Sequence, residues 1–182
     1  MALFINFVAF QLGWFASVLS AAALAPWFGA LVVLGVLAMH LARAARPRAE
    51  LALLVLCGGI GGLWDSFLVT MGWVAYPSGM FMEGAAPYWI IMMWLLFATT
   101  LNVSMGWLKG RPLLAAGFGL AGGPLSYIAG EKLGGIILVD TQAALIALAL
   151  AWAVLMPLLL LLAERLNGIT AMRSSAGLVA ES

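Results

Sequence analysis

Long apolar stretches recur along the whole chain, and they limit the folds that it can adopt. The hydrocarbon core of a membrane is about 30 Å thick, so a helix needs roughly 20 apolar residues to cross it. Only 8% of the residues are charged, whereas a soluble domain carries about 25%. The sequence therefore predicts an all-α, polytopic membrane bundle with six transmembrane helices. The predicted helices span residues 3–24, 28–42, 51–72, 88–108, 112–128 and 141–162.

The positions of the basic residues predict the orientation of this bundle. Seven of the eight Lys and Arg residues follow the second, fourth or sixth predicted helix and so fall on one side of the membrane. On the other side Lys132 is the one basic residue, and acidic residues accompany it. Because basic loops are retained in the cytoplasm during insertion, we expect both termini to be cytoplasmic. The seven residues are Arg43, Arg46, Arg48, Lys109, Arg111, Arg165 and Arg173.

The domain organisation follows from the same pattern. Residues 1–166 are predicted to form one transmembrane domain, and residues 167–182 a cytoplasmic tail that is disordered. The net charge of +1 gives no reason to expect a nucleic-acid partner. With Cys57 as the single cysteine, an intrachain disulfide and a cysteine metal cluster are excluded. No nucleotide, phosphate or nucleophile motif occurs, so no cofactor is predicted.

Asp65 is the acidic residue that lies well inside a predicted helix. It stands about 14 residues, or roughly 21 Å, from the cytoplasmic start of that helix. An ionisable residue at such a position costs at least ~2.5 kcal/mol on insertion and is by default a candidate for function. Two interpretations stay open: a functional carboxylate, or a hydrogen-bonded one that locks helices together.

The same depth argument selects neighbours for Asp65. Tyr127 and Glu131 reach the outer half and the outer boundary of the fifth helix, and Glu83 lies in the preceding outer loop. We therefore predict a catalytic cluster of Asp65, Glu131, Tyr127 and Glu83. Carboxylates that share a poorly solvated site have separated proton affinities, which suits them to acid and base roles. Glu131 has a second interpretation as a residue that faces lipid headgroups.

Other polar residues are predicted to be structural. Amides within a membrane usually pair across helices, so Asn6, Gln11 and Asn102 are interpreted as structural polar residues. Small residues spaced by four, such as Gly58 with Gly62, let helices approach closely. Since the fifth helix has a similar series, we expect the third and fifth helices to be neighbours.

Four separated motifs carry a family resemblance. They are NFVAFQLGWF at 6–15, WDSFL at 64–68, APYWIIMMWLLFATTLNVSMGWL at 86–108 and GGPLSYIAGEKLG at 122–134. In this order they resemble the bacterial membrane family catalogued as domain of unknown function 2878, over residues 3–165. The resemblance implies an inner-membrane protein of proteobacterial type. It also implies gene neighbourhoods for fatty-acyl modification, which point toward lipid metabolism.

These observations lead to two functional hypotheses. The first is a lipid-associated protein, either an enzyme or an accessory subunit, that acts on an acyl or isoprenoid substrate from the bilayer. Its expected partners are membrane lipids, a second copy of the chain in a homodimer, or a lipid-modifying enzyme. The alternative is a small proton- or cation-coupled transporter or channel in which Asp65 binds the ion.

Overall fold

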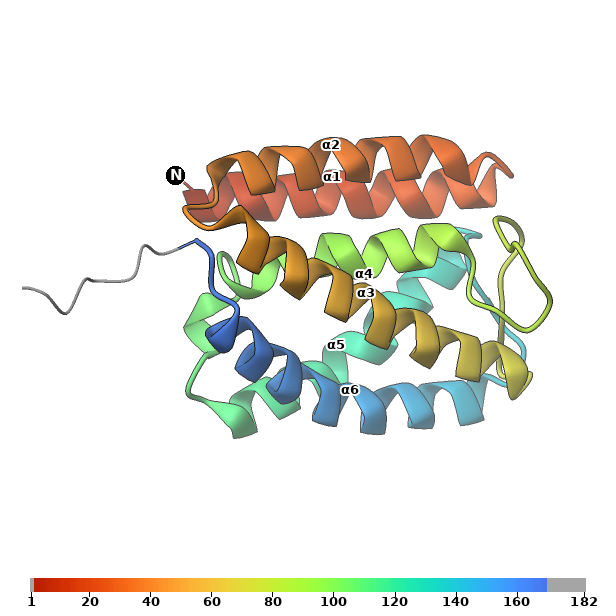
Figure 1. Cartoon of the computed structure of the whole chain (residues 1–182). Helices are drawn as coiled ribbons and strands as arrows, with labels where there is room; N and C mark the ends of the chain where they lie inside the picture. The colour runs from red at the N-terminus through yellow and green to blue at the C-terminus, as the bar shows by residue number, and fades with distance from the viewer. Residues whose placement is uncertain (1, 170–182) are drawn as a thin grey trace, which may run out of the picture.

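The chain forms an all-α bundle of six helices in the computed structural model, which describes residues 2–169 (Figure 1). Two short strands and one 3₁₀ helix lie in the connections. The helices are α1 (Ala2–Ala22), α2 (Pro26–Arg43), α3 (Pro47–Thr70), α4 (Tyr88–Leu101), α5 (Pro112–Lys132) and α6 (Thr141–Arg165). The shorter elements are β1 (Val74–Ala75), η1 (Gly106–Leu108) and β2 (Ile137–Leu138).

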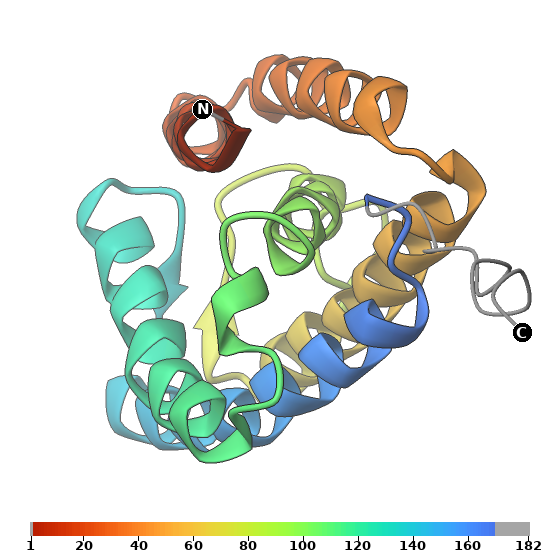
Figure 2. The same cartoon turned by 90° about the vertical axis from the view of Figure 1, so that its left-hand side faces the viewer.

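Helix α4 occupies the centre of the bundle. Seen end-on, it lies between the α1–α2 pair and the α5–α6 pair, with α3 alongside (Figure 2). Most of its side chains are buried, among them Trp89, Trp94 and Leu96. The outer helices instead expose large apolar side chains, such as Phe4 on α1 and Leu113 on α5. An apolar exterior of this kind fits a membrane, and five of the described helices are long and apolar enough to cross one.

The exception in length is α4, for which the predicted end is wrong. The apolar sequence continues to Leu108, but the helix ends at Leu101 and gives way to turns and η1. Non-helical backbone is tolerated at membrane depth where protein surrounds it. Asn6 of α1 supplies this protection, because its side chain donates to the Thr99 carbonyl (3.1 Å) and accepts from the Ser104 amide (3.3 Å).

Three of the helices begin with proline, and two of these begin earlier than predicted, at residue 26 instead of 28 and at residue 47 instead of 51. Pro26, Pro47 and Pro112 each stand in the first turn of a helix, where a missing N–H leaves no hydrogen bond unmade. The helix predicted from residue 51 therefore starts four residues earlier, and Glu50 lies in its first turn.

Glycines mark the closest helix contacts, although not between the helices that we expected. A Cβ on Gly61 of α3 would lie 1.9 Å from Trp94 of α4, and one on Gly119 of α5 would lie 2.1 Å from the Trp152 carbonyl oxygen of α6. The main neighbour of α3 is thus α4, and that of α5 is α6. The prediction that glycine contacts pair α3 with α5 is wrong, because the spacing identifies a close approach but not the partner.

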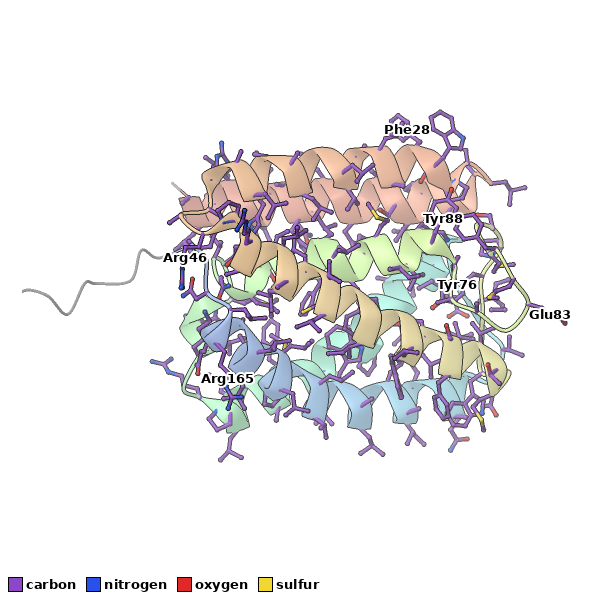
Figure 3. All side chains as sticks on the ribbon, in the orientation of Figure 1. Phe28, Arg46, Tyr76, Glu83, Tyr88 and Arg165 are labelled. Atoms are coloured by element: carbon purple, nitrogen blue, oxygen red, sulfur yellow. The ribbon has the colours of Figure 1, made fainter. Side chains whose placement is uncertain are left out.

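The two ends of the bundle differ in charge. Arg46 and Arg165 lie at the end that also holds the start of α1, and Glu83 lies at the opposite end (Figure 3). That opposite end is closed by the pairing of β1 with β2, in which Val74 faces Leu138. Arg173 and most of the predicted tail lie outside the described residues. Asn167 and Gly168, the first tail residues, contact Arg46 and Glu50.

The α5–α6 contact gives a direct test of this packing. We expect Gly119→Ala to lower the free energy of unfolding by about 1–3 kcal/mol, because its methyl group would overlap the α6 backbone. Gly117→Ala is the matched control, since nothing lies within 4 Å of its Cβ position. Unfolding in mixed detergent, followed by tryptophan fluorescence, measures both. Equal stabilities of the two variants would contradict the packing.

Candidate functional site

Asp65 lies in the interior of the bundle and accepts three hydrogen bonds. Its side chain has no exposed surface. One carboxylate oxygen, Oδ1, accepts from the hydroxyl of Tyr76 at 2.6 Å and from the hydroxyl of Tyr127. The other oxygen, Oδ2, accepts from the indole N–H of Trp94 at 2.7 Å. Asp65 therefore joins α3 to α4, to α5 and to the loop that follows β1.

The Tyr76 side of this cluster depends on how the loop over residues 71–87 is held. Ser78 of the loop donates to the Ala21 carbonyl at 2.9 Å, and its own carbonyl accepts from the Trp89 indole at 3.1 Å. The Ala86 amide donates to Ser66, one residue after Asp65. These bonds tie the loop to α1, α3 and α4, so Tyr76 is directed into the bundle.

No positive charge compensates Asp65. Among residues 2–169 the single ion pair joins His40 to Glu50, and no cation pairs with Asp65. A buried charge is tolerated only when it is paired or hydrogen-bonded, and here three neutral donors serve that purpose. Burial raises the pKa of the Tyr76 hydroxyl well above its usual range, so Tyr76 stays protonated and donates.

An apolar cavity of about 230 Å³ lies on the other side of Trp94 and Tyr127. It is partly open and lies between α1 and α5, two helices that stand apart in Figure 2. Aromatic rings form much of its wall, and Trp94 stacks on Trp152 with ring centroids 4.8 Å apart. Its lining residues include Phe10 and Trp14 of α1, Trp94 and Phe97 of α4, Phe118, Gly122, Ser126 and Tyr127 of α5, and Trp152 of α6.

The structure brings together only part of the predicted catalytic cluster. Tyr127 reaches Asp65, but Glu131 accepts from the Leu138 amide at 3.2 Å and so positions β2. Glu83 is exposed in its loop, at the end of the molecule (Figure 3). The expected group of several carboxylates is therefore replaced by one carboxylate with three neutral donors. Position along the helix axis predicted the contact of Tyr127 with Asp65, but it does not specify the direction in which Glu131 points around the axis.

Tyr76 and Trp94 are the site residues that the sequence pattern did not predict. Trp94 lies deep in a predicted helix. A Trp at such a position is explained by packing or by a place in a pocket wall, so the sequence gives no reason to expect a hydrogen bond from its indole to Asp65. Tyr76 belongs to the loop over residues 71–87, and no sequence spacing encodes the return of this loop into the bundle. A sequence signal did exist for both, because a buried carboxylate without a nearby cation requires donors from Tyr, Trp, Ser or Asn.

A second polar cluster lies at the basic end. The fully buried Glu50 contacts His40 at 2.8 Å, Asn102 at 2.6 Å and the Gly168 amide at 2.7 Å. Asn102 in turn accepts from Lys109, whose amino-group pKa is lowered mainly by burial. These bonds join α2, α3, the end of α4 and the segment after α6.

The three residues predicted to be structural polar lie in different surroundings. Asn6 supports the end of α4, Asn102 belongs to the cluster around Glu50, and Gln11 is half-buried on α1. Among the described residues no group of three or more His, Cys, Asp or Glu side chains could hold a metal ion. Around Asp65, the carboxylate can accept hydrogen bonds and a proton, and the two phenols and the Trp94 indole can donate.

Because three donors bond to Asp65, we expect a variant with a neutral side chain at this position to be less stable. We expect Asp65→Asn to lower the free energy of unfolding by about 1–3 kcal/mol, because its amide NH₂ must face groups that now donate. Glu83→Gln is the matched control, and its effect should stay within about 0.5 kcal/mol, as for an exposed side chain. Detergent unfolding of the two variants tests this. A loss as small as that of the control would contradict the hydrogen-bond assignment.

Comparison with known proteins bears on the family alone. No curated protein and no solved structure matches the chain. The family described as "Protein of unknown function (DUF2878)" matches residues 3–158. This range contains Asp65 and all three of its hydrogen-bond donors. Because the match covers most of the sequence, the chain belongs to the DUF2878 family.

Proposed function

We propose that this protein binds a membrane lipid with an acyl or isoprenoid chain and positions its polar group at Tyr127 and Asp65. One observation carries the proposal: a partly open apolar cavity has Tyr127 in its wall, and the Tyr127 hydroxyl donates to the buried Asp65. Ligand sites are typically apolar cavities with a few polar groups that fix orientation. An ionisable residue inside a membrane protein is likewise a functional candidate by default.

The position of the cavity supports a ligand that arrives from the bilayer. Phe118, at the cavity wall, is 44% exposed on the apolar exterior of α5. A hydrocarbon chain that passes from the bilayer into this cavity leaves one apolar environment for another, so the transfer itself gains little free energy. The choice among lipids must therefore come from the fit of the chain and from the contacts of its polar group. The stacked Trp94 and Trp152 rings offer flat walls for such a chain.

The Tyr127–Asp65 pair supplies the chemistry of the proposal. When a ligand proton passes to the Tyr127 oxygen, the phenolic proton passes to Asp65, which changes from carboxylate to carboxylic acid. This transfer needs groups within hydrogen-bond reach and no further component. The protein then acts either as the enzyme or as the subunit that presents the lipid to a partner enzyme, and in both cases the cavity is the lipid site.

The proposed location is the bacterial inner membrane, with the basic end in the cytoplasm. Six described basic residues support this orientation, because they lie at the end of α2, at the start of α3, at the end of α6 or in the connections from α2 to α3 and from α4 to α5. They are Arg43, Arg46, Arg48, Lys109, Arg111 and Arg165. Lys and Arg in short loops are retained on the cytoplasmic side. Under this orientation both termini are cytoplasmic, and Asp65 lies in the outer half of the membrane.

Filling the cavity tests lipid binding without touching the polar pair. A Cβ on Gly122 meets only Phe118, at 4.0 Å, so Gly122→Leu should place its side chain in the cavity. In nanodiscs that contain a phospholipid with a diazirine in its acyl chain, we expect cross-links to the cavity-lining residues Trp94, Tyr127 and Trp152 in the wild type. Gly122→Leu should reduce these cross-links several-fold, because the chain loses its space.

Gly117→Leu is the control for this experiment, since Gly117 is exposed on the same helix and lies outside the cavity lining. It should keep wild-type labelling at the cavity-lining residues. Equal labelling in the wild type and in both leucine variants would contradict a lipid site in the cavity.

A comparative lipid profile tests the function in cells. We expect a lipid species to change in cells that lack the protein and to return with the wild type or Gly117→Leu, but not with Gly122→Leu or Asp65→Asn. The physical reason is that Gly122→Leu blocks the chain and Asp65→Asn removes the proton acceptor. Unchanged profiles in all strains, combined with gradient-driven ion flux in proteoliposomes, would overturn the lipid proposal in favour of transport.

A further inference from the structure

The hydrogen-bond directions at the cavity wall specify what kind of polar group fits there. A hydroxyl group has one proton to donate and two lone pairs that accept. Tyr127 uses its proton on Asp65, and Ser126 donates to the Gly123 carbonyl at 2.7 Å. Both side chains line the cavity. Each therefore has accepting capacity left for a ligand and no free proton to donate.

One of the rings in the cavity wall carries a donor without a partner among the described residues. The indole N–H of Trp152 is buried and makes no hydrogen bond within residues 2–169, and the Trp152 ring forms part of the lining. Leaving a buried donor unmet costs about 1–3 kcal/mol. A ligand oxygen reaches this N–H only when the Trp152 ring turns toward the cavity, and an oxygen that also donates to Tyr127 would then satisfy the site in both directions.

Charge narrows the choice further. None of the described residues that line the cavity is Lys, Arg or His, and the carboxylate of Asp65 lies directly behind Tyr127. A phosphate, diphosphate or ionised carboxylate placed there would be buried without a cation and close to a second negative charge, which is strongly unfavourable. The described basic side chains that could bind such a group lie in the terminal turns of the helices or in the connections between them.

We propose that the cavity binds a neutral lipid alcohol, whose hydroxyl group donates to the Tyr127 oxygen and through it is linked to Asp65. A hydroxyl group both donates and accepts hydrogen bonds and carries no charge. It therefore fits the hydrogen-bonding groups of the cavity wall and the negative charge of the nearby Asp65. This inference rests on the proposed lipid binding and specifies its ligand class. A linear fatty alcohol and an isoprenoid alcohol share this chemistry, and they differ only in how their chains fit.

Competition among lipids with one common chain tests the proposal. The wild-type chain in nanodiscs is labelled with a long-chain alcohol that carries a diazirine, in the presence of unlabelled hexadecanol, its methyl ether, hexadecanoic acid or hexadecyl phosphate. We expect the alcohol to compete about tenfold better than the ether, which cannot donate, and better than both anions. Farnesol and farnesyl diphosphate form the isoprenoid arm, and the alcohol should again compete better.

Tyr127→Phe provides the second measurement. The variant should still take up the probe, because the apolar walls remain, but it should lose the preference for alcohol over ether. Tyr88→Phe is the matched control, because Tyr88 stacks on Phe81 outside the cavity lining, and it should keep the preference.

The outcomes separate the two proposals. If the alcohol, the ether and the anions compete equally and labelling remains at the cavity, the proposal of an alcohol ligand is wrong, whereas the proposal of lipid binding stands. If Tyr127→Phe keeps the full preference for alcohol over ether, the proposal of an alcohol ligand is also wrong, and the proposal of lipid binding again stands. Absence of labelling at the cavity-lining residues would overturn both proposals.

Discussion

The structure is organised around a buried carboxylate that must be satisfied without a counter-ion. Asp65 accepts from Tyr76, Trp94 and Tyr127, and leaving such a group unpaired in an apolar interior would cost several kcal/mol. The requirement brings three separate parts of the chain to one point on α3. It also explains why the loop after β1 turns back into the bundle instead of staying at its surface, since only a buried Tyr76 can donate.

The same rule applies to the backbone of α4. Its helix stops at Leu101, which leaves carbonyl and amide groups inside the bundle that lipid could not satisfy. Asn6 bonds to two of these groups, while Asn102 at the helix end joins the cluster around Glu50. The interior therefore has two polar clusters, one on each side of an apolar layer that includes Leu54 and Cys57 of α3. Each cluster ties a different set of helices together.

Sequence reasoning predicted those features that depend on distance along a helix axis. The apolar runs gave the all-α bundle, and depth in the membrane selected Tyr127 as a neighbour of Asp65. Features that depend on direction around an axis or on the return of a loop were not accessible, as Glu131 and Tyr76 illustrate. The apolar run that predicts α3 begins after Glu50 and so does not identify it, although Pro47 marks the start of the helix. Glycine spacing indicated close approach, yet the identity of the partner helix depends on where Trp94 and Trp152 point.

Structural and functional interpretations of Asp65 converge at the cavity wall. Trp94 and Tyr127 satisfy the carboxylate on one side and form the cavity on the other, so neither residue can move without affecting both. Trp152 packs against Gly119 and Gly123, whereas a Cβ on Gly122 would meet only Phe118, at 4.0 Å. A carboxylate that only locked helices would require its donors and no adjoining space. Because a cavity adjoins those donors, and because Gly122 can be enlarged without touching them, occupancy of the site and stability of the bundle can be changed separately.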